Sequence, residues 1–159
     1  MSEENIPATD EAAEPADTAP VFHVEKLYLK DLSFESPNTP EVFREQAEPQ
    51  VDFNLATGAT QKGPEHFEVV LHVTIKTLLG ERTMFLVDLT YAGLFLLRHM
   101  PRELLTPMLA IECPAILFPY VRQIVADMIM QGGFRPLVLD PINFSALYHQ
   151  SQRQKQAEQ

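Results

Sequence analysis

Apolar and polar residues alternate along residues 66–79, HFEVVLHVTIKTLL, and again along residues 83–91, TMFLVDLTY. A period of two, rich in β-branched residues, predicts antiparallel strands with one covered face and one face in water. The link through Gly80 and Glu81 is short and contains glycine, which predicts a β-hairpin. The side chains expected on the covered face are Phe67, Val69, Leu71, Val73, Ile75 and Leu79 in the first strand and Phe85, Val87, Leu89 and Tyr91 in the second.

Two earlier segments also have the pattern of strands, VFHVEKLYLKDLSFE at residues 21–35 and QVDFNLA at residues 50–56. Between them, Pro37, Pro40 and Pro49 predict a loop with little regular structure, because proline fixes φ and lacks a backbone donor. With the hairpin, these segments predict a four-stranded antiparallel sheet.

The period changes to that of a helix after Pro101, and Pro114 opens a second helical run that Gly132 and Gly133 end. Asn143 can cap a last helix, FSALYHQSQRQ. The predicted apolar stripe of the long run is Leu117, Val121, Ile124 and Met128, widened by Phe118, Val125 and Ile129. Strands followed by helices predict an α+β fold with the helices on one face of the sheet.

The stretch LFPYVRQIV, residues 117–125, is apolar on nearly every side, and the polar side of its helix is narrow. Such a helix is expected to be covered twice, once by its own sheet and once, most simply, by another subunit. Methionines and aromatics follow the same region, and they fit either a core or an adaptable binding surface. These residues are Met100, Met108, Met128, Met130, Phe118, Tyr120 and Phe134.

Composition sets further limits on this 159-residue chain. Its 45% hydrophobic and 21% charged residues are typical of one globular domain, which we place at residues 20–150. No unbroken run of about 18 apolar residues is present, and the start MSEENIPATDEAAEP lacks the features of a secretory signal. We therefore expect a cytoplasmic protein without stable membrane insertion. The single cysteine fits a reducing compartment.

Charge is concentrated at the N-terminus: the formal net charge is −10, and residues 1–20 hold six acids and no Lys or Arg. We expect residues 1–19 to form a disordered acidic tail and residues 151–159 a polar, flexible C-terminal tail. A chain this acidic, with no basic stripe among aromatics, is not expected to bind nucleic acid.

Catalytic and cofactor patterns are not found. His66 and His72 share a predicted strand face, but six residues of strand hold them about 20 Å apart, too far to ligate one metal ion. Cys113 has no adjacent base and is expected to be a packed thiol. The chain has no glycine-rich nucleotide-binding motif. We therefore expect no enzyme activity, no metal and no cofactor.

Acidic and apolar residues alternate on the wet face of the predicted sheet. Leu86 and Asp88 lie there in one strand, and Asp31 and Glu35 share a face in the first strand. From the residues alone, this surface is either a solvated sheet face or a docking site.

Four stretches, in order, resemble the SecB family of bacterial protein-export chaperones, and together they span about residues 21–150. They are LYLKDLSFESPNTPEVF, FEVVLHVTIKTLLGERTMFL, ECPAILFPYVRQIVADMI and LDPINFSALY. The resemblance implies a homotetramer built as a dimer of dimers. It also implies an ATP-independent holdase that binds unfolded precursor proteins in apolar grooves and delivers them to the SecA motor.

The resemblance also carries residue roles onto matching positions of this chain. It implies a SecA dock at Asp31, Glu35, Leu86 and Asp88, where the family commonly has glutamate in place of Asp88. It implies a client groove lined by Phe43 and Tyr120. It implies packing that supports the tetramer at Phe85, Val87, Leu89 and Tyr91. The alternatives are an oligomeric adaptor for a folded partner and an enzyme or small-ligand binder.

Overall fold

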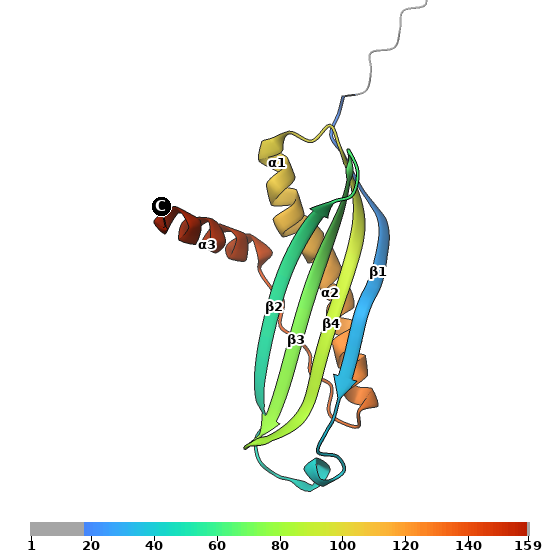
Figure 1. Cartoon of the computed structure of the whole chain (residues 1–159), viewed down its shortest axis with the longest axis vertical. Helices are drawn as coiled ribbons and strands as arrows, with labels where there is room; N and C mark the ends of the chain where they lie inside the picture. Colours follow the sequence, from blue (N-terminus) through green and yellow to red (C-terminus); the bar gives the residue numbers. More distant parts are fainter. Residues whose placement is uncertain (1–17, 159) are drawn as a thin grey trace, which may run out of the picture.

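A computed structural model describes residues 18–158, so most of the predicted acidic tail, residues 1–17, lies outside the described part of the chain. Figure 1 shows a long four-stranded sheet with a helix running behind it. All neighbouring strands are antiparallel, in the order β1-β4-β3-β2. The strands are β1 (Val21–Glu35), β2 (Gln50–Gln61), β3 (His66–Leu79) and β4 (Arg82–Arg98). The α+β fold with a four-stranded antiparallel sheet is confirmed.

The predicted hairpin joins β3 to β4 through Gly80 and Glu81. Gly80 has φ +59°, a conformation that glycine adopts without the clash of a Cβ atom. All ten side chains predicted to face inward are buried, with exposed fractions between 0 and 8%. Burial on one face of each strand thus follows the alternation in the sequence.

The other two strands form the edges of the sheet. β1 has the predicted bounds, and two irregularities in its register interrupt its pairing with β4, one between Val24 and Lys26 and one between Leu29 and Asp31. β2 extends to Gln61, five residues beyond the prediction, because ATGATQ pairs in register with β3 as far as Phe67. The loop between β1 and β2 contains one short 3-10 helix, η1 (Glu41–Arg44).

The two predicted helical runs after Pro101 form one continuous helical segment from Arg102 to Gln131. It consists of α1 (Arg102–Pro107), a π-helical turn η2 (Met108–Glu112) and α2 (Cys113–Gln131). Pro114 lies in the first turn of α2 and does not separate two helices, because the residues before it are already helical. Proline in that position lacks one backbone donor, and the wider turn of η2 directly precedes it.

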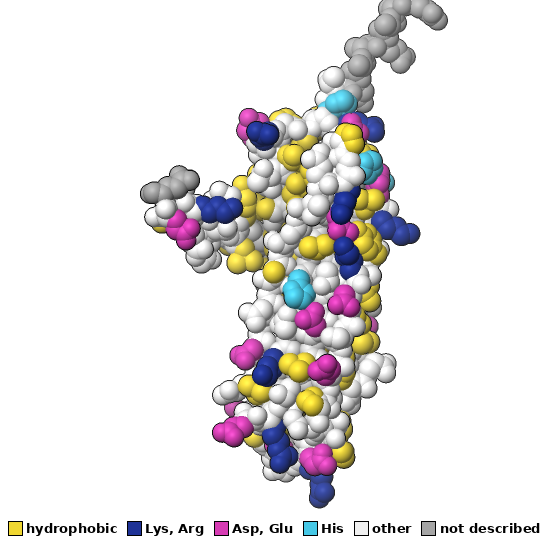
Figure 2. Space-filling model, in the orientation of Figure 1, with side chains coloured by type: hydrophobic (Ala, Val, Ile, Leu, Met, Phe, Trp, Pro, Cys, Tyr) yellow, Lys and Arg dark blue, Asp and Glu magenta, His cyan; other side chains and the backbone are white. Residues whose placement is uncertain are grey.

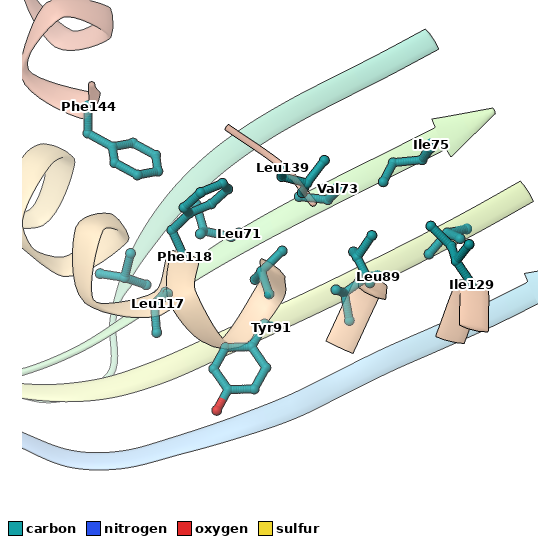
Figure 3. Packing of buried hydrophobic residues seen from close by; sticks show 14 of the residues in the cluster. Leu71, Val73, Ile75, Leu89, Tyr91, Leu117, Phe118, Ile129, Leu139 and Phe144 are labelled. Atoms are coloured by element: carbon teal, nitrogen blue, oxygen red, sulfur yellow. The ribbon is translucent and has the colours of Figure 1, made fainter. Parts of the chain in front are cut away.

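The buried face of α2 is centred one position away from the predicted stripe. Figure 3 shows Leu117 and Ile129 of α2 facing Leu71 and Leu89 of the sheet. The fully or nearly fully buried apolar side chains of α2 are Cys113, Pro114, Leu117, Phe118, Val121, Val125 and Ile129. Ile124 and Met128, predicted to be central, are only partly buried, and of the two Ile124 packs against this core.

The end of α2 follows the prediction of a glycine stop. Gly133 has φ +88°, its N–H donates to Met130 O, and the N–H of Phe134 donates to Ile129 O. This pair of hydrogen bonds is a Schellman motif, which satisfies the last carbonyls of the helix. It also turns Phe134 back toward the sheet, where its ring contacts Phe85.

The last helix, α3 (Phe144–Ala157), begins as predicted, with the Asn143 side chain accepting a hydrogen bond from the N–H of Ala146 at 3.0 Å. It leaves the body of the molecule sideways and packs mainly against η2 (Figure 1). The helix continues to Ala157, so it includes most of the residues that we assigned to a C-terminal tail. The division into two tails and one domain stays a prediction.

Candidate functional site

The face of the sheet opposite α2 brings the four predicted SecA-dock residues together. Glu35 of β1 lies opposite Leu86 of β4. Ser33, two residues before Glu35, lies opposite Asp88, so the two strands place these residues side by side. Asp31 follows two positions along β1, and both acids of β1 are exposed. We call Asp31, Glu35, Leu86 and Asp88 the outer patch. Their role stays a prediction.

The outer patch is not purely acidic, because β3 places cationic side chains beside it. His72 Nε2 lies 2.9 Å from Asp88 Oδ1, with both side chains nearly half exposed. Lys76 lies directly opposite Leu86. Figure 2 shows this face with acidic, basic and histidine side chains interspersed among apolar ones. The alternation along β3 puts His72 and Lys76 on the wet face, but only the pairing of β3 with β4 brings them next to the outer patch.

The four residues predicted to support the tetramer lie on the opposite, inner face of β4. Phe85, Val87, Leu89 and Tyr91 are all buried within one chain, with α2 packed over β3 and β4. Their first role is therefore to hold α2 on the sheet. Any effect on subunit assembly would act through the position of α2 and stays a prediction.

Phe43, one of the two predicted groove residues, lines a pocket of about 430 Å³ at the hairpin end of the sheet. Its ring lies 5.0 Å from that of Phe134, and Phe134 lies 5.1 Å from Phe85, measured between ring centroids. Phe43 is 49% exposed, so the pocket is open at η1. We call it the aromatic pocket; its main lining residues are Val42, Phe43, Val51, Thr77, Phe85 and Phe134.

The aromatic pocket is the first of several hollows along the inner side of β2. Since α2 packs over β3 and β4, it does not cover the successive inner-face residues of β2. The hollows have volumes of about 300, 400 and 250 Å³. Residues 137–142, α3 and η2 form their other wall. We call this surface the β2 groove; β2 contributes Val51, Phe53, Leu55, Thr57, Gly58 and Ala59.

Tyr120, the second predicted groove residue, lies elsewhere in the chain. It projects from α2, is 44% exposed, and stacks on Tyr91 with ring centroids 5.7 Å apart. Burial, with a smaller contribution from Tyr120, raises the pKa of Tyr91. Tyr120 does not line the aromatic pocket or the β2 groove. Within one chain, the structure therefore does not place Phe43 and Tyr120 in a shared groove.

The long helical segment exposes several large apolar residues, namely Leu104, Tyr120 and Met130. The segment Arg102–Gln131 is long and apolar enough to span a membrane by length and composition. The segment contains no unbroken run of about 18 apolar residues, because charged residues interrupt it, so the sequence criterion used above did not identify it as a possible membrane span. The core helix of a soluble protein meets the same criterion, and this helix packs on the sheet.

Metal-ligating side chains do not cluster within the described residues 18–158. No group of three or more His, Cys, Asp or Glu residues lies close enough there to hold a metal ion. Burial, with a smaller contribution from Glu112, raises the pKa of the Cys113 thiol to about 12. A thiol with this pKa is protonated near neutral pH and is a poor nucleophile.

Comparison with known proteins gives consistent matches over most of the chain. The family described as "Preprotein translocase subunit SecB" matches residues 15–155. The protein-export protein SecB of Magnetococcus marinus is 53% identical over 142 residues, covering 89% of this chain and 90% of the relative. The SecB of Chromobacterium violaceum is 48% identical over 146 residues, covering 92% and 97%.

A solved structure has the same fold. It is a Mycobacterium tuberculosis SecB-like chaperone in complex with a ChAD peptide from the HigA1 antitoxin. The TM-score is 0.64 at 18% sequence identity, and the match covers 76% of this chain and 90% of the other. The family match and the two relatives identify the chain as a member of the SecB family of protein-export chaperones, which are not enzymes.

Proposed function

We propose that this protein is an ATP-independent holdase that binds unfolded precursor proteins in the cytoplasm and delivers them to the SecA motor. The observation that carries the proposal is the β2 groove, an open apolar surface bordered by an aromatic pocket at one end. Its hollows follow β2 from Val51 to Ala59, which suits an extended chain as occupant. The related M. tuberculosis chaperone was solved with a bound peptide, which supports a peptide as the occupant.

The affinity of the groove would come from apolar burial. Each Å² of apolar client surface removed from water contributes roughly 25 cal/mol before the costs of association. The large side chains available on β2, Val51 and Phe53, are 44% and 38% exposed, so they can still bury area against a client. Binding of this kind depends little on the order of residues in the client, which suits a chaperone for many precursors.

The outer patch lies on the opposite face of the sheet from the groove. Client and motor would therefore contact separate surfaces, so SecA could bind while a precursor still occupies the groove. The exposed carboxylates Asp31 and Glu35 would attract a partner surface rich in cations. The exposed apolar side of α2 would be covered by a second copy, giving a homotetramer built as a dimer of dimers.

The test is a native mass spectrum recorded with a denatured secretory precursor and, separately, with the same precursor folded. We expect a tetramer that captures the unfolded form and not the folded form. An accompanying aggregation assay should show delayed aggregation of the precursor without added ATP. Capture of only the folded form would instead support an adaptor for folded partners, and failure to delay aggregation would remove the holdase proposal.

A further inference from the structure

The alternation of faces along β1 is broken once next to the outer patch. Leu29 and Leu32 both pair with inward-facing residues of β4, yet three positions separate them where a regular strand would have two. The pairing register shifts just after Leu29, and Lys30 is the residue that the register skips. Lys30 is therefore the extra residue of a β-bulge.

This bulge decides which face of the sheet carries Asp31. With a strict period of two after Leu29, the next inward-facing residue would be Asp31 itself. The bulge instead places Asp31 opposite Thr90, which lies two positions after Asp88 on β4 and shares its face. Asp31 therefore belongs to the outer patch only because β1 has an extra residue at this point.

Glu68 of β3 contacts the side chains at this bulge. Its carboxylate accepts a hydrogen bond from the Tyr28 hydroxyl and lies 3.1 Å from Lys30 Nζ. β4 runs between β1 and β3, so both contacts reach across a whole strand (Figure 1). The Glu68 side chain is only 13% exposed, although it lies on the outer face of the sheet. One carboxylate thus holds the bulged residue and a residue just before it.

We propose that Glu68 is a positioning residue of the SecA dock, because through Tyr28 and Lys30 it fixes the bulge that turns Asp31 outward. β1 is an edge strand, paired along one side only, so side-chain contacts have a large share in fixing its backbone. Glu68 itself lies outside the outer patch. This inference rests on the proposed function and adds a residue that prepares the dock without belonging to it.

The experiment measures SecA binding by surface plasmon resonance for two variants of the full-length protein. Tyr28→Phe removes the hydroxyl and changes no charge. Lys30→Met removes a positive charge beside the acidic outer patch, which by charge alone would strengthen the binding of a cationic partner surface. Because both variants release the bulge, we expect both to weaken SecA binding, by about two- to fivefold, the range that one hydrogen bond or exposed ion pair supports.

A double-mutant cycle tests whether the effect acts through Asp31. Once Asp31→Ala is present, Tyr28→Phe should weaken SecA binding no further. In the presence of Asp88→Ala it should still do so, because β4 and not the bulge sets the position of Asp88. Tyr28→Phe should also have no further effect on Glu68→Ala, since the carboxylate that receives its hydrogen bond is then absent.

Glu25→Gln is the matched control on the same strand. It weakens the contact of 3.1 Å between Glu25 and His66 at the other register shift of β1, between Val24 and Lys26. This point is roughly 15–20 Å along the strand from Asp31, farther than exposed charges interact at physiological salt. We expect Glu25→Gln to leave SecA binding unchanged. Client capture, measured in the aggregation assay, should be unchanged in every variant.

The outcomes separate this inference from the proposed function. If SecA does not bind the wild-type protein, the proposed delivery to SecA fails, and the inference fails with it. If SecA binds the wild-type protein but Tyr28→Phe binds equally well, or Lys30→Met binds more tightly, the inference alone is wrong. Equal weakening by Glu25→Gln, or loss of client capture in Tyr28→Phe, would show a general loosening of β1, which also overturns the positioning role.

Discussion

Gly93 of β4 lies in a crowded part of the core, which makes Gly93→Ala a sensitive test of the fold. A Cβ atom at this position would lie 2.6 and 2.8 Å from two ring carbons of Phe95 and 3.1 Å from Leu117 Cδ2. Phe95 is fully buried and stacks on Phe22 with centroids 5.8 Å apart, so its ring cannot move aside without disturbing β1. The added methyl group must therefore displace the Phe95 ring within β4 and the end of the Leu117 side chain on α2.

The expected cost follows from two opposing effects. Overpacking a core typically costs about 1–3 kcal/mol, while replacing glycine by alanine within a strand recovers about 0.5–1 kcal/mol. We expect a net loss of about 1–2 kcal/mol in the free energy of unfolding, or about 2–8 °C in Tm for a chain of this size. Urea unfolding at one fixed protein concentration measures it, because oligomer stability depends on concentration.

Gly58→Ala is the matched control, since a Cβ there would meet only Val70 Cγ2, at 3.3 Å. We expect its effect to stay within about 0.5 kcal/mol. If Gly93→Ala proved as stable as the wild-type protein, the close packing of the Phe95 ring against Gly93 would be wrong. Loss of stability in both variants alike would show that a general strand effect, and not the contact with Phe95, causes the change.

Three further predictions concern other parts of the chain. The hydrogen bond from the Tyr28 hydroxyl lowers the pKa of the Glu68 carboxylate below 4.5. The ionised carboxylate therefore stabilises the folded protein fully above about pH 4.5, and this stabilisation is lost as the pH falls through the lowered pKa. Glu68→Gln removes the titrating group, so the free energy of urea unfolding should depend less on pH in this acid range. Asn143→Ala should cost about 1 kcal/mol in helix capping, seen as faster amide exchange in α3, while Asn143→Ser should not. Asp88→Ala should weaken SecA binding about three- to tenfold by surface plasmon resonance and leave client binding unchanged; equal loss of both would contradict the dock.

The hairpin shows how far the sequence alone can be taken. The alternation in β3 and β4 correctly predicted both faces, because one face packs under a helix and the other meets water. Counting back from the turn, where Leu79 pairs with Arg82, would place Asp88 opposite Val73, an inward-facing residue. Cross-strand partners lie on the same face of a sheet, so an outward-facing Asp88 requires the pairing register of β3 and β4 to shift by one residue. The structure has this register shift between Thr77 and Leu78. The shift is therefore predictable in principle, and it places Asp88 opposite Thr74.

Other elements depended on tertiary contacts that no local pattern encodes. The end of β2 is rich in Ala, Thr and Gly, and its strand structure comes from pairing with β3 rather than from propensity. Pro114 resembles a helix start, but the preceding residues continue the helix through η2. The buried stripe on α2 was predicted one position away from its place in the structure. In so hydrophobic a helix, several neighbouring stripes at helical spacing are apolar, and the sequence does not show which of them faces the sheet.

The candidate site was predicted unevenly. The outer patch came from the family resemblance, and the pairing of β1 with β4 brings its four residues together. The β2 groove was not predicted, because it exists only where α2 leaves β2 uncovered and residues 137–142 form a second wall.

The exposure of β2 has a consequence for the internal motions of the protomer. β2 pairs with one strand only, and Leu55 is its sole side chain packed against the buried core cluster, whereas β1, the other edge strand, contributes five. Few buried contacts and solvent-exposed backbone hydrogen bonds make a segment open at low free-energy cost. The wall of the groove is thus the strand that separates most readily from the sheet, while β3 and β4 stay closed behind it. The width of the groove can fluctuate without unfolding of the core.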